Sequence, residues 1–125
     1  SFTVREVGGT MQPVWSRYFE GCGAVVFAVD TTSSAAAAAA AIEWYNLLGS
    51  PALKKKPMLL LLNKRDDSQA LSEAMLQLAL RIPECEDAAS GHRNVSHLAV
   101  SALTGEGMPA LLDWMTEALA AQSRE

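Results

Sequence analysis

Apolar residues along this chain fall into short continuous runs separated by longer stretches of helical spacing. The runs at residues 24–29 and 58–62 have the length of strands and are apolar throughout, as in strands buried on both faces of a sheet. Residues 95–100 contain a further short apolar stretch. At residues 2–7 apolar and polar positions alternate, which predicts a strand with one exposed face.

Helical spacing of apolar residues predicts a helix after each of these strands. The predicted helices are residues 12–20, a helix capped at residues 32–34 and broken by residues 49–51, a helix capped by Asp67 or Ser68 and ended by Pro83, and a last helix with Pro109 in its first turn. Residues predicted to face the core are Ile42, Tyr45 and Leu48, then Leu71, Met75, Leu78 and Ala79, then Met108, Leu111, Leu112, Met115 and Leu119.

The alternation of buried strands with helices predicts an α/β fold. Such an order produces a mostly parallel sheet with helices on both faces. The chain has 125 residues, a length that suits one domain, and it contains no linker or repeat. We therefore expect residues 1–125 to form one domain.

Composition excludes some classes of function. The net charge is −4, which argues against a broad nucleic-acid surface. The basic run at residues 54–56 is better explained as a solvated loop than as a contact with anionic lipid. Cys22 and Cys85 are expected to be free thiols, and no targeting segment is visible, so we expect a cytoplasmic protein. His92 and His97 lack a partner set with metal-ligand spacing.

Polar residues follow each predicted strand. The strands end in Glu6-Val7-Gly8-Gly9, Asp30-Thr31, Asn63-Lys64-Arg65-Asp66 and Ser101-Ala102-Leu103. In open parallel sheets, ligands bind beyond the carboxyl ends of the strands. The pattern therefore predicts that these residues collect along one edge and form a binding site.

The Asn63-Lys64-Arg65-Asp66 segment has the chemistry needed to read guanine. The Asp66 carboxylate could accept hydrogen bonds from N1–H and the 2-amino group, both absent from adenine, which would leave the carboxylate unpaired. Asn63 could bond N7 or tie neighbouring loops together, and the stem of Lys64 could lie along the ring. The Ala102 N–H could donate to O6. The alternative is a strand end followed by a charged turn and a helix cap.

These residues resemble motifs of a known family. Asn63-Lys64-x-Asp66 resembles the guanine-specificity motif of small GTPases, and Ser101-Ala102-Leu103 resembles their last base-contacting loop. Residues 5–9 and Pro13-Val14-Trp15-Ser16-Arg17-Tyr18-Phe19 resemble the switch II segment of the Arf and Arf-like family. The short Gly-Gly-x-Met-x-Pro-x-Trp spacing is similar to a divergent branch of that family.

The resemblance implies a P-loop small-GTPase fold that lacks the N-terminal strands and the phosphate loop. No G-x-x-x-x-G-K-[ST] sequence occurs in the chain, so residues 1–125 resemble a partial Arf-like GTPase domain. The family's ligands are GTP and GDP, with Mg²⁺ expected only in a complete domain. In the family's sheet a further strand lies between those matching 2–7 and 24–29. Its loss predicts an apolar slot and poor stability for this chain alone.

The chain departs from the family at the γ-phosphate side of the site. The DxxG motif reads Glu6-Val7-Gly8-Gly9, and the longer Glu6 side chain disfavours the magnesium contact that the family makes through water. The Gly9 N–H could still meet a γ-phosphate. Thr10 stands where the family has its water-orienting glutamine and is too short for that task. We therefore assign no catalytic residue and expect weak intrinsic hydrolysis.

Two classes of function remain open. The resemblance implies a GTP/GDP-dependent switch in membrane or ciliary trafficking, with effectors bound through switch II. Its aromatic residues Trp15, Tyr18 and Phe19 are about as well explained as core. The alternative is a non-hydrolysing Arf-like interaction module, favoured by Glu6 and Thr10. An unrelated doubly wound enzyme would need a nucleophile–base pair, which the spacing does not provide. Membrane association does not follow from these residues.

Overall fold

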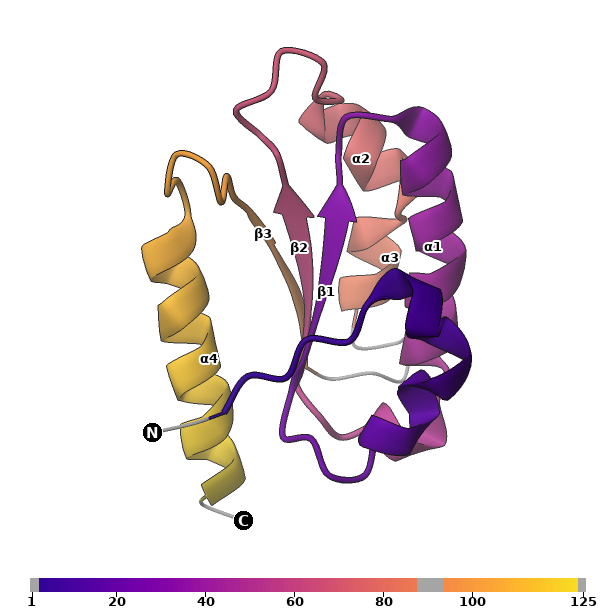
Figure 1. Cartoon of the computed structure of the whole chain (residues 1–125), viewed down its shortest axis with the longest axis vertical. Coiled ribbons are helices and arrows are strands. Elements are labelled where there is room, and N and C mark those ends of the chain that lie inside the picture. The colour runs from indigo at the N-terminus through magenta and orange to yellow at the C-terminus, as the bar shows by residue number, and fades with distance from the viewer. Residues whose placement is uncertain (1–2, 88–93, 124–125) are drawn as a thin grey trace.

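The computed structural model of the chain describes residues 3–87 and 94–123, and its described strands form one parallel sheet (Figure 1). The strands are β1 (Val25–Asp30), β2 (Met58–Asn63) and β3 (Val95–Ala99), in the spatial order β1-β2-β3. Residue 25 lies opposite 58, and 58 lies opposite 95. The strands predicted at 24–29, 58–62 and 95–100 are therefore confirmed. None of their ends differs from the prediction by more than one residue.

Helices cover both faces of the sheet, as predicted. The elements are η1 (Gly9–Tyr18), α1 (Ser34–Leu48), η2 (Pro51–Leu53), α2 (Glu73–Ala79), α3 (Ile82–Glu86) and α4 (Met108–Ser123). Figure 1 shows α1, α2 and α3 on one face and α4 on the other. Among the described residues, no helix is both long and apolar enough to cross a membrane.

The central strand β2 divides the core into two clusters. Met58, Leu60 and Leu62 belong to the cluster beneath α1, α2 and α3. Leu59 and Leu61 point the other way and belong to the cluster that contains Leu111 of α4. Side chains alternate between the faces of a strand, so a strand covered on both faces has to be apolar at every position. This explains why β2 appears in the sequence as a continuous apolar run.

Helix α1 begins as predicted, and two of the three residues predicted to face the core, Tyr45 and Leu48, pack against it. The side chain of Ser33 accepts a hydrogen bond from the Ala36 N–H and caps the helix. Ile42, predicted to be in the core, is 61% exposed. The buried residues are Ala37, Ala41, Trp44 and Leu47. The bulk of Trp44 sets which side of the helix turns inward, and the two small alanines let its first turns approach the sheet closely.

Helix α2 begins later than predicted. Its cap is Ser72, whose side chain accepts from the Met75 N–H, in place of Asp67 or Ser68. The Asp67 carboxylate instead accepts from the Gln69 N–H and closes a turn before the helix. An aspartate can stabilise either a turn or a cap with the same short-range bond, so the sequence pattern did not distinguish the two.

The apolar faces of α2 and α4 also differ in part from the prediction. In α2, Leu76 is buried, while Met75 and Leu78 are 53% and 82% exposed. In α4, Leu111 is buried as predicted and Leu112 is 57% exposed.

The strand predicted at residues 2–7 is wrong for the part that the structure describes. Residues 3–8 form no strand, and Val4 is 67% exposed. Figure 1 shows this indigo segment crossing in front of the sheet, from the side of α4 to that of η1. A strand needs a neighbouring ladder for its backbone groups, and a cavity separates this segment from the outer edge of β1.

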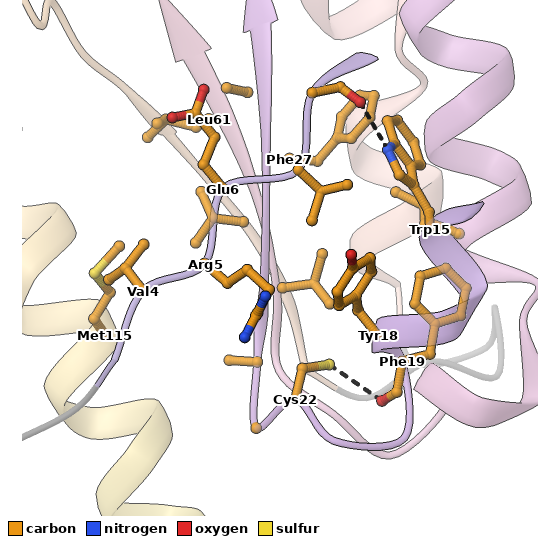
Figure 2. Close-up of a pocket in the computed structure, with 18 of the residues that line it drawn as sticks. Val4, Arg5, Glu6, Trp15, Tyr18, Phe19, Cys22, Phe27, Leu61 and Met115 are labelled. Carbon is orange, nitrogen blue, oxygen red and sulfur yellow. Dashed lines mark hydrogen bonds between the residues drawn. The ribbon is translucent and has the colours of Figure 1, made fainter. Parts of the chain in front are cut away.

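The cavity has a volume of about 1280 Å³ and lies beside β1 (Figure 2). Its lining includes Trp15 and Phe19 on one side and Leu111, Trp114 and Met115 on the other. The cavity lies between residues 3–9 and β1, where the apolar slot was predicted.

The predicted helix 12–20 appears as the 3-10 helix η1, Gly9–Tyr18. Its aromatic end is packed on the core. The Trp15 ring meets Phe27 of β1 edge-on at 6.1 Å between centroids, and Phe27 stacks on Trp44 of α1 at 5.7 Å. The Trp15 indole N–H also donates to the Gly8 carbonyl at 3.0 Å. This stack attaches η1 to the sheet.

Candidate functional site

The carboxyl ends of the strands bring their polar residues together as predicted. Asp30 ends β1 directly opposite Asn63 at the end of β2. Beyond β3, the Val100 N–H donates to the Leu62 carbonyl at 2.8 Å and the Arg65 N–H donates to the Val100 carbonyl at 3.2 Å. These bonds hold the chain after β3 against the chain after β2, so the segments containing Asn63 and Ser101 share one edge.

Asn63 ties the two loops of this edge together. Its side-chain oxygen accepts from the Lys64 N–H at 2.7 Å and from the Ala102 N–H at 3.1 Å. This is one of the two roles predicted for Asn63. It also uses the Ala102 N–H that was predicted to meet guanine O6, so in this structure that donor faces a protein oxygen. Its role towards O6 stays a prediction.

Asp66 is exposed at the surface and fixed in direction by Ser101. The buried Ser101 hydroxyl donates to a carboxylate oxygen of Asp66 at 2.6 Å. The same hydroxyl oxygen accepts from the Thr104 N–H at 3.1 Å. Leu103, the third residue predicted in this loop, is 86% exposed. The carboxylate predicted to read the base is thus presented outward on a fixed support.

Glycine shapes the loop that carries Ser101. Gly107 has a φ of 78°, and a Cβ placed there would lie 2.5 Å from the Ala99 carbonyl oxygen. Gly105 has a φ of 87° but faces open space. The tight turn lets the Ser101 N–H donate to the Glu106 carbonyl at 2.9 Å. Only glycine combines this backbone conformation with such a close approach.

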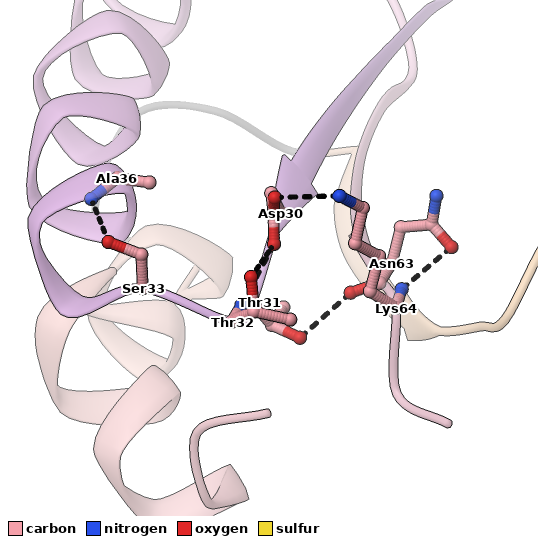
Figure 3. Close-up of polar contacts among 7 residues, drawn as sticks. All are labelled: Asp30, Thr31, Thr32, Ser33, Ala36, Asn63 and Lys64. Carbon is pink, nitrogen blue, oxygen red and sulfur yellow. Dashed lines mark hydrogen bonds and ion pairs between the residues drawn. The ribbon is translucent and has the colours of Figure 1, made fainter. Parts of the chain in front are cut away.

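Lys64 and Asp30 form an ion pair between the ends of two strands (Figure 3). The Lys64 Nζ lies 2.9 Å from Asp30 Oδ2. Asp30 Oδ1 accepts from the Thr32 N–H at 2.9 Å and from the Thr32 hydroxyl at 2.6 Å. These bonds from Thr32, with the Lys64 ammonium, lower the pKa of Asp30 to about 2. The hydrogen bond to Asp30 raises the pKa of Lys64.

Thr31 and Arg65 support the backbone of Asn63. The sequence placed both at the strand ends but assigned them no role. The buried Thr31 hydroxyl donates to the Asn63 carbonyl at 2.8 Å. The Arg65 guanidinium donates to that hydroxyl at 3.2 Å and to the Leu71 carbonyl at 2.7 Å. Asp30 and Thr32 form a typical side-chain turn after a strand, which was a signal that Thr31, between them, has a fixed position. No pattern in the sequence gave Arg65 its supporting role.

The predicted γ-phosphate residues lie elsewhere. Glu6, Gly8 and Gly9 line the cavity beside β1, and no described contact joins them to Asn63, Asp66 or Ser101. The side chain of Thr10 lies outside the described residues. Within residues 3–87 and 94–123 no group of three histidine, cysteine or acidic side chains could hold a metal.

The predicted effector aromatics are half-buried. Trp15 and Phe19 pack against the core cluster under α1, while the guanidinium of Arg5 lies 5.4 Å from the centre of the Tyr18 ring. Of the two explanations for these residues, the structure supports the core for Trp15 and Phe19 and does not test effector binding.

Comparison with known proteins identifies the family. The family model of the ADP-ribosylation factor family matches residues 1–119. Human ADP-ribosylation factor-like protein 16 is 29% identical over 113 residues, which cover 90% of this chain and 56% of that protein. ADP-ribosylation factor-like protein 1 of Saccharomyces cerevisiae is 31% identical over 118 residues, or 93% of this chain and 62% of that protein.

ADP-ribosylation factor J of Dictyostelium discoideum is 31% identical over 121 residues, covering 95% of this chain and 62% of that protein. The chain thus spans about three fifths of the length of these relatives. The family match extends over nearly all of its residues and agrees with the parallel sheet and its two helical layers. The chain belongs to the ADP-ribosylation factor family of small GTPases.

Proposed function

We propose that the protein is a guanine-nucleotide switch whose base-reading half is the edge formed by Asn63, Asp66 and Ser101. The observation that carries the proposal is the Ser101 hydroxyl, buried and 2.6 Å from a carboxylate oxygen of an exposed Asp66. Such a support presents a carboxylate to a ligand at no further cost in orientation. Family membership supports GTP and GDP as the ligands.

The chemistry of the edge favours guanine over adenine. An outward carboxylate at Asp66 can accept from N1–H and the 2-amino group, whereas adenine presents only an acceptor at N1. A purine without these donors would cover the carboxylate and leave it unpaired, at a cost of about 1–3 kcal/mol or more. The Lys64 stem and the loop at Ala102 complete this half of the site.

The phosphates and Mg²⁺ belong to the other half of the proposed site. Family membership supports Mg²⁺ as the ion that would accompany the nucleotide in a complete domain. The longer Glu6 side chain disfavours the family's contact with this ion through water, whereas the Gly9 N–H would face the γ-phosphate. When bound, Mg²⁺ neutralises charge on the phosphates.

The test of base reading is the Asp66→Asn substitution in the full native protein. An amide donates where the carboxylate accepts, so affinity for GDP should fall by at least about tenfold, or ~1.4 kcal/mol. Affinity for xanthosine diphosphate, which offers a carbonyl in place of the amino group, should rise. Asp67→Asn, one residue away, is the matched control. A wild-type protein that binds ADP as well as GDP would reject the proposal.

We further propose that intrinsic GTP hydrolysis is weak, because Thr10 replaces the residue that orients water in the resembled family. Single-turnover hydrolysis by the full native protein should be slow and should rise when Thr10 is changed to Gln. Thr10→Ser serves as the control for a change of side chain without a carboxamide. A wild-type rate typical of the family would contradict this proposal.

The cellular role remains a proposal based on family likeness. We propose that the protein acts in the cytoplasm, in membrane or ciliary trafficking, and that effectors bind near Tyr18, Trp15 and Phe19. The second candidate, a non-hydrolysing interaction module, is favoured by Glu6 and by Thr10. The two differ in one measurement: a switch binds partners differently when loaded with GTP or GDP, and an interaction module binds them equally.

A further inference from the structure

The ion pair between Lys64 and Asp30 is unusual for its place in the fold. The two side chains are 54% and 40% exposed, and exposed pairs of this kind contribute little to folding. Each partner is nevertheless held firmly from its own strand. Because the pair is poorly explained by stability, its fixed geometry calls for another explanation.

The carboxylate of Asp30 is oriented before it meets the lysine. One oxygen accepts both hydrogen bonds from Thr32, from its N–H and from its hydroxyl, which leaves the other oxygen facing Lys64. Figure 3 shows the Lys64 side chain reaching from the end of β2 towards the end of β1. The carboxylate is therefore a fixed anchor for the ammonium group.

The backbone of Lys64 is also constrained. Its φ of 65° lies in the left-handed region, which non-glycine residues seldom adopt and which costs energy. The Asn63 side chain holds this conformation by accepting the Lys64 N–H at 2.7 Å. With both ends of the side chain fixed, the methylene stem between them spans neighbouring strand ends, and more than half of the side chain stays exposed.

We propose that Asp30 is a positioning residue for nucleotide binding, which holds the Lys64 stem as a flat apolar strip against the purine ring. The inference rests on the proposed function of the edge at Asn63 and Asp66. Asp30 touches no ligand itself and acts through Lys64. A ring lying on the stem excludes water from the ion pair, and removing water strengthens the attraction between the charges.

The inference separates affinity from selectivity. Stacking on a methylene stem depends on the planar shape of the ring and not on its hydrogen-bonding groups. Loss of the Asp30 anchor should therefore weaken guanine and hypoxanthine nucleotides equally. Discrimination between them depends on the 2-amino group, which the inference leaves to Asp66.

The test is a double-mutant cycle in the full native protein with Asp30→Asn and Lys64→Met. Asparagine keeps an oxygen for the Thr32 bonds and removes the anchor's charge. Methionine keeps an unbranched apolar stem and removes the ammonium group. Each single variant should bind GDP about tenfold more weakly, a change of ~1.4 kcal/mol. The double variant should lose no more than either single variant, because both remove the same interaction.

Two further readouts separate positioning from damage to the loop. The ratio of GDP to inosine diphosphate affinity should stay at the wild-type value in Asp30→Asn, and Asp67→Asn should leave GDP affinity unchanged although it also removes a nearby negative charge. Additive losses in the cycle, or a collapse of the GDP to inosine diphosphate ratio, would overturn the inference while leaving guanine binding intact. Failure of the wild-type protein to bind GDP would reject the proposed function, and the inference with it.

Discussion

Two edges of the sheet differ in how they are held. At the carboxyl edge, side chains of Asn63, Ser101 and Asp30 make hydrogen bonds of 2.6 to 3.1 Å to neighbouring loops. Along the outer edge of β1, residues 3–8 form no strand and a cavity of about 1280 Å³ intervenes. One half of the proposed site is held by bonds between loops, while the segment carrying the other half pairs with no strand in the part of the chain that the structure describes.

The difference separates the two halves of the proposed site in the structure. The residues proposed to read the base follow β2 and β3, which pair with each other and are covered on both faces. The predicted phosphate-sensing residues belong to a segment with no place in the sheet. The same cavity leads us to expect that this chain alone is poorly stable. Cooperative thermal unfolding well above room temperature would contradict that expectation.

The largest predicted effect concerns the packing of the central strand β2 compared with that of residues 3–8. Leu60→Ala in the centre of β2 should lower the free energy of unfolding by about 3–4 kcal/mol, because Leu60 is 1% exposed and its removal leaves a void. Val4→Ala in the N-terminal segment should change it by about 0.5 kcal/mol or less. Urea denaturation of both variants measures the contrast. Equal effects would mean that residues 3–8 are packed in solution.

The next effect tests the loop that carries Ser101. Gly107→Ala should cost about 2–3 kcal/mol, because the new methyl group meets the Ala99 carbonyl and the backbone is in the left-handed region. Gly105→Ala has a similar φ but open space, and should cost about 1 kcal/mol. Denaturation midpoints give both values. A Gly107 variant no worse than its control would show that the close approach is absent in solution.

Hydrogen exchange sharpens the comparison without any mutation. Amides of β2 donate within a ladder covered on both faces, so they should exchange only through large openings of the fold. Amides of residues 3–8 make no described backbone bond and should exchange at rates near those of an unfolded chain. Mass spectrometry on peptides from the two regions measures this. Protection of residues 3–8 would indicate that the segment pairs with β1.

The smallest effect is the pH dependence of Asp30. Its pKa in the folded chain, about 2, lies below the ordinary value of 3.8. The bonds to Asp30 therefore stabilise the fold fully above about pH 4, and this contribution is lost as pH falls towards 2. The Thr32 hydroxyl is the largest cause, so Thr32→Val should raise the pKa more than Lys64→Met does. Thr32→Ser should leave it near 2.

Titration of the Asp30 carboxyl by NMR gives these pKa values directly. The reverse order, with Lys64→Met raising the pKa more than Thr32→Val, would mean that the ion pair dominates over the turn. Lys64 would still lie beside Asp30 in that case, but Lys64, and not Thr32, would be the main residue that orients the Asp30 carboxylate.

The order of most elements, and the meeting of Asn63, Asp66 and Ser101 at one edge, could be predicted because both have strong local signals; the role of these residues towards a nucleotide stays a prediction. Continuous apolar runs marked β1 and β2, and Asn63, Asp66 and Ser101 follow strands at positions where the chemistry is specific. The strand predicted from the alternation at residues 2–7 was wrong, because alternation indicates only a preference for the strand conformation. A strand also needs a neighbouring strand to pair with, and the pattern does not report whether one is present. Asp30 was given a minor role because its importance depends on Lys64, a residue 34 positions away.

Helix faces were predicted less well, and α1 shows why. Spacing placed Ile42 inside because it is strongly apolar, but Trp44 is the larger residue and is 1% exposed. Ala37 and Ala41 carry almost no directional signal in a tract of alanines, and both are buried. The orientation of α1 therefore depends on the sizes of Ala37, Ala41 and Trp44, and the periodicity of apolar residues does not measure side-chain size.

The seven consecutive alanines at residues 35–41 lie between the two points at which α1 is fixed. Helix α1 is fixed at its start by the Ser33 cap and further along by Trp44 in the core. One added alanine would turn Trp44 by about 100° and move it by about 1.5 Å relative to the cap. An alanine added to the tract, with every other residue intact, would thus take the largest fully buried side chain out of register.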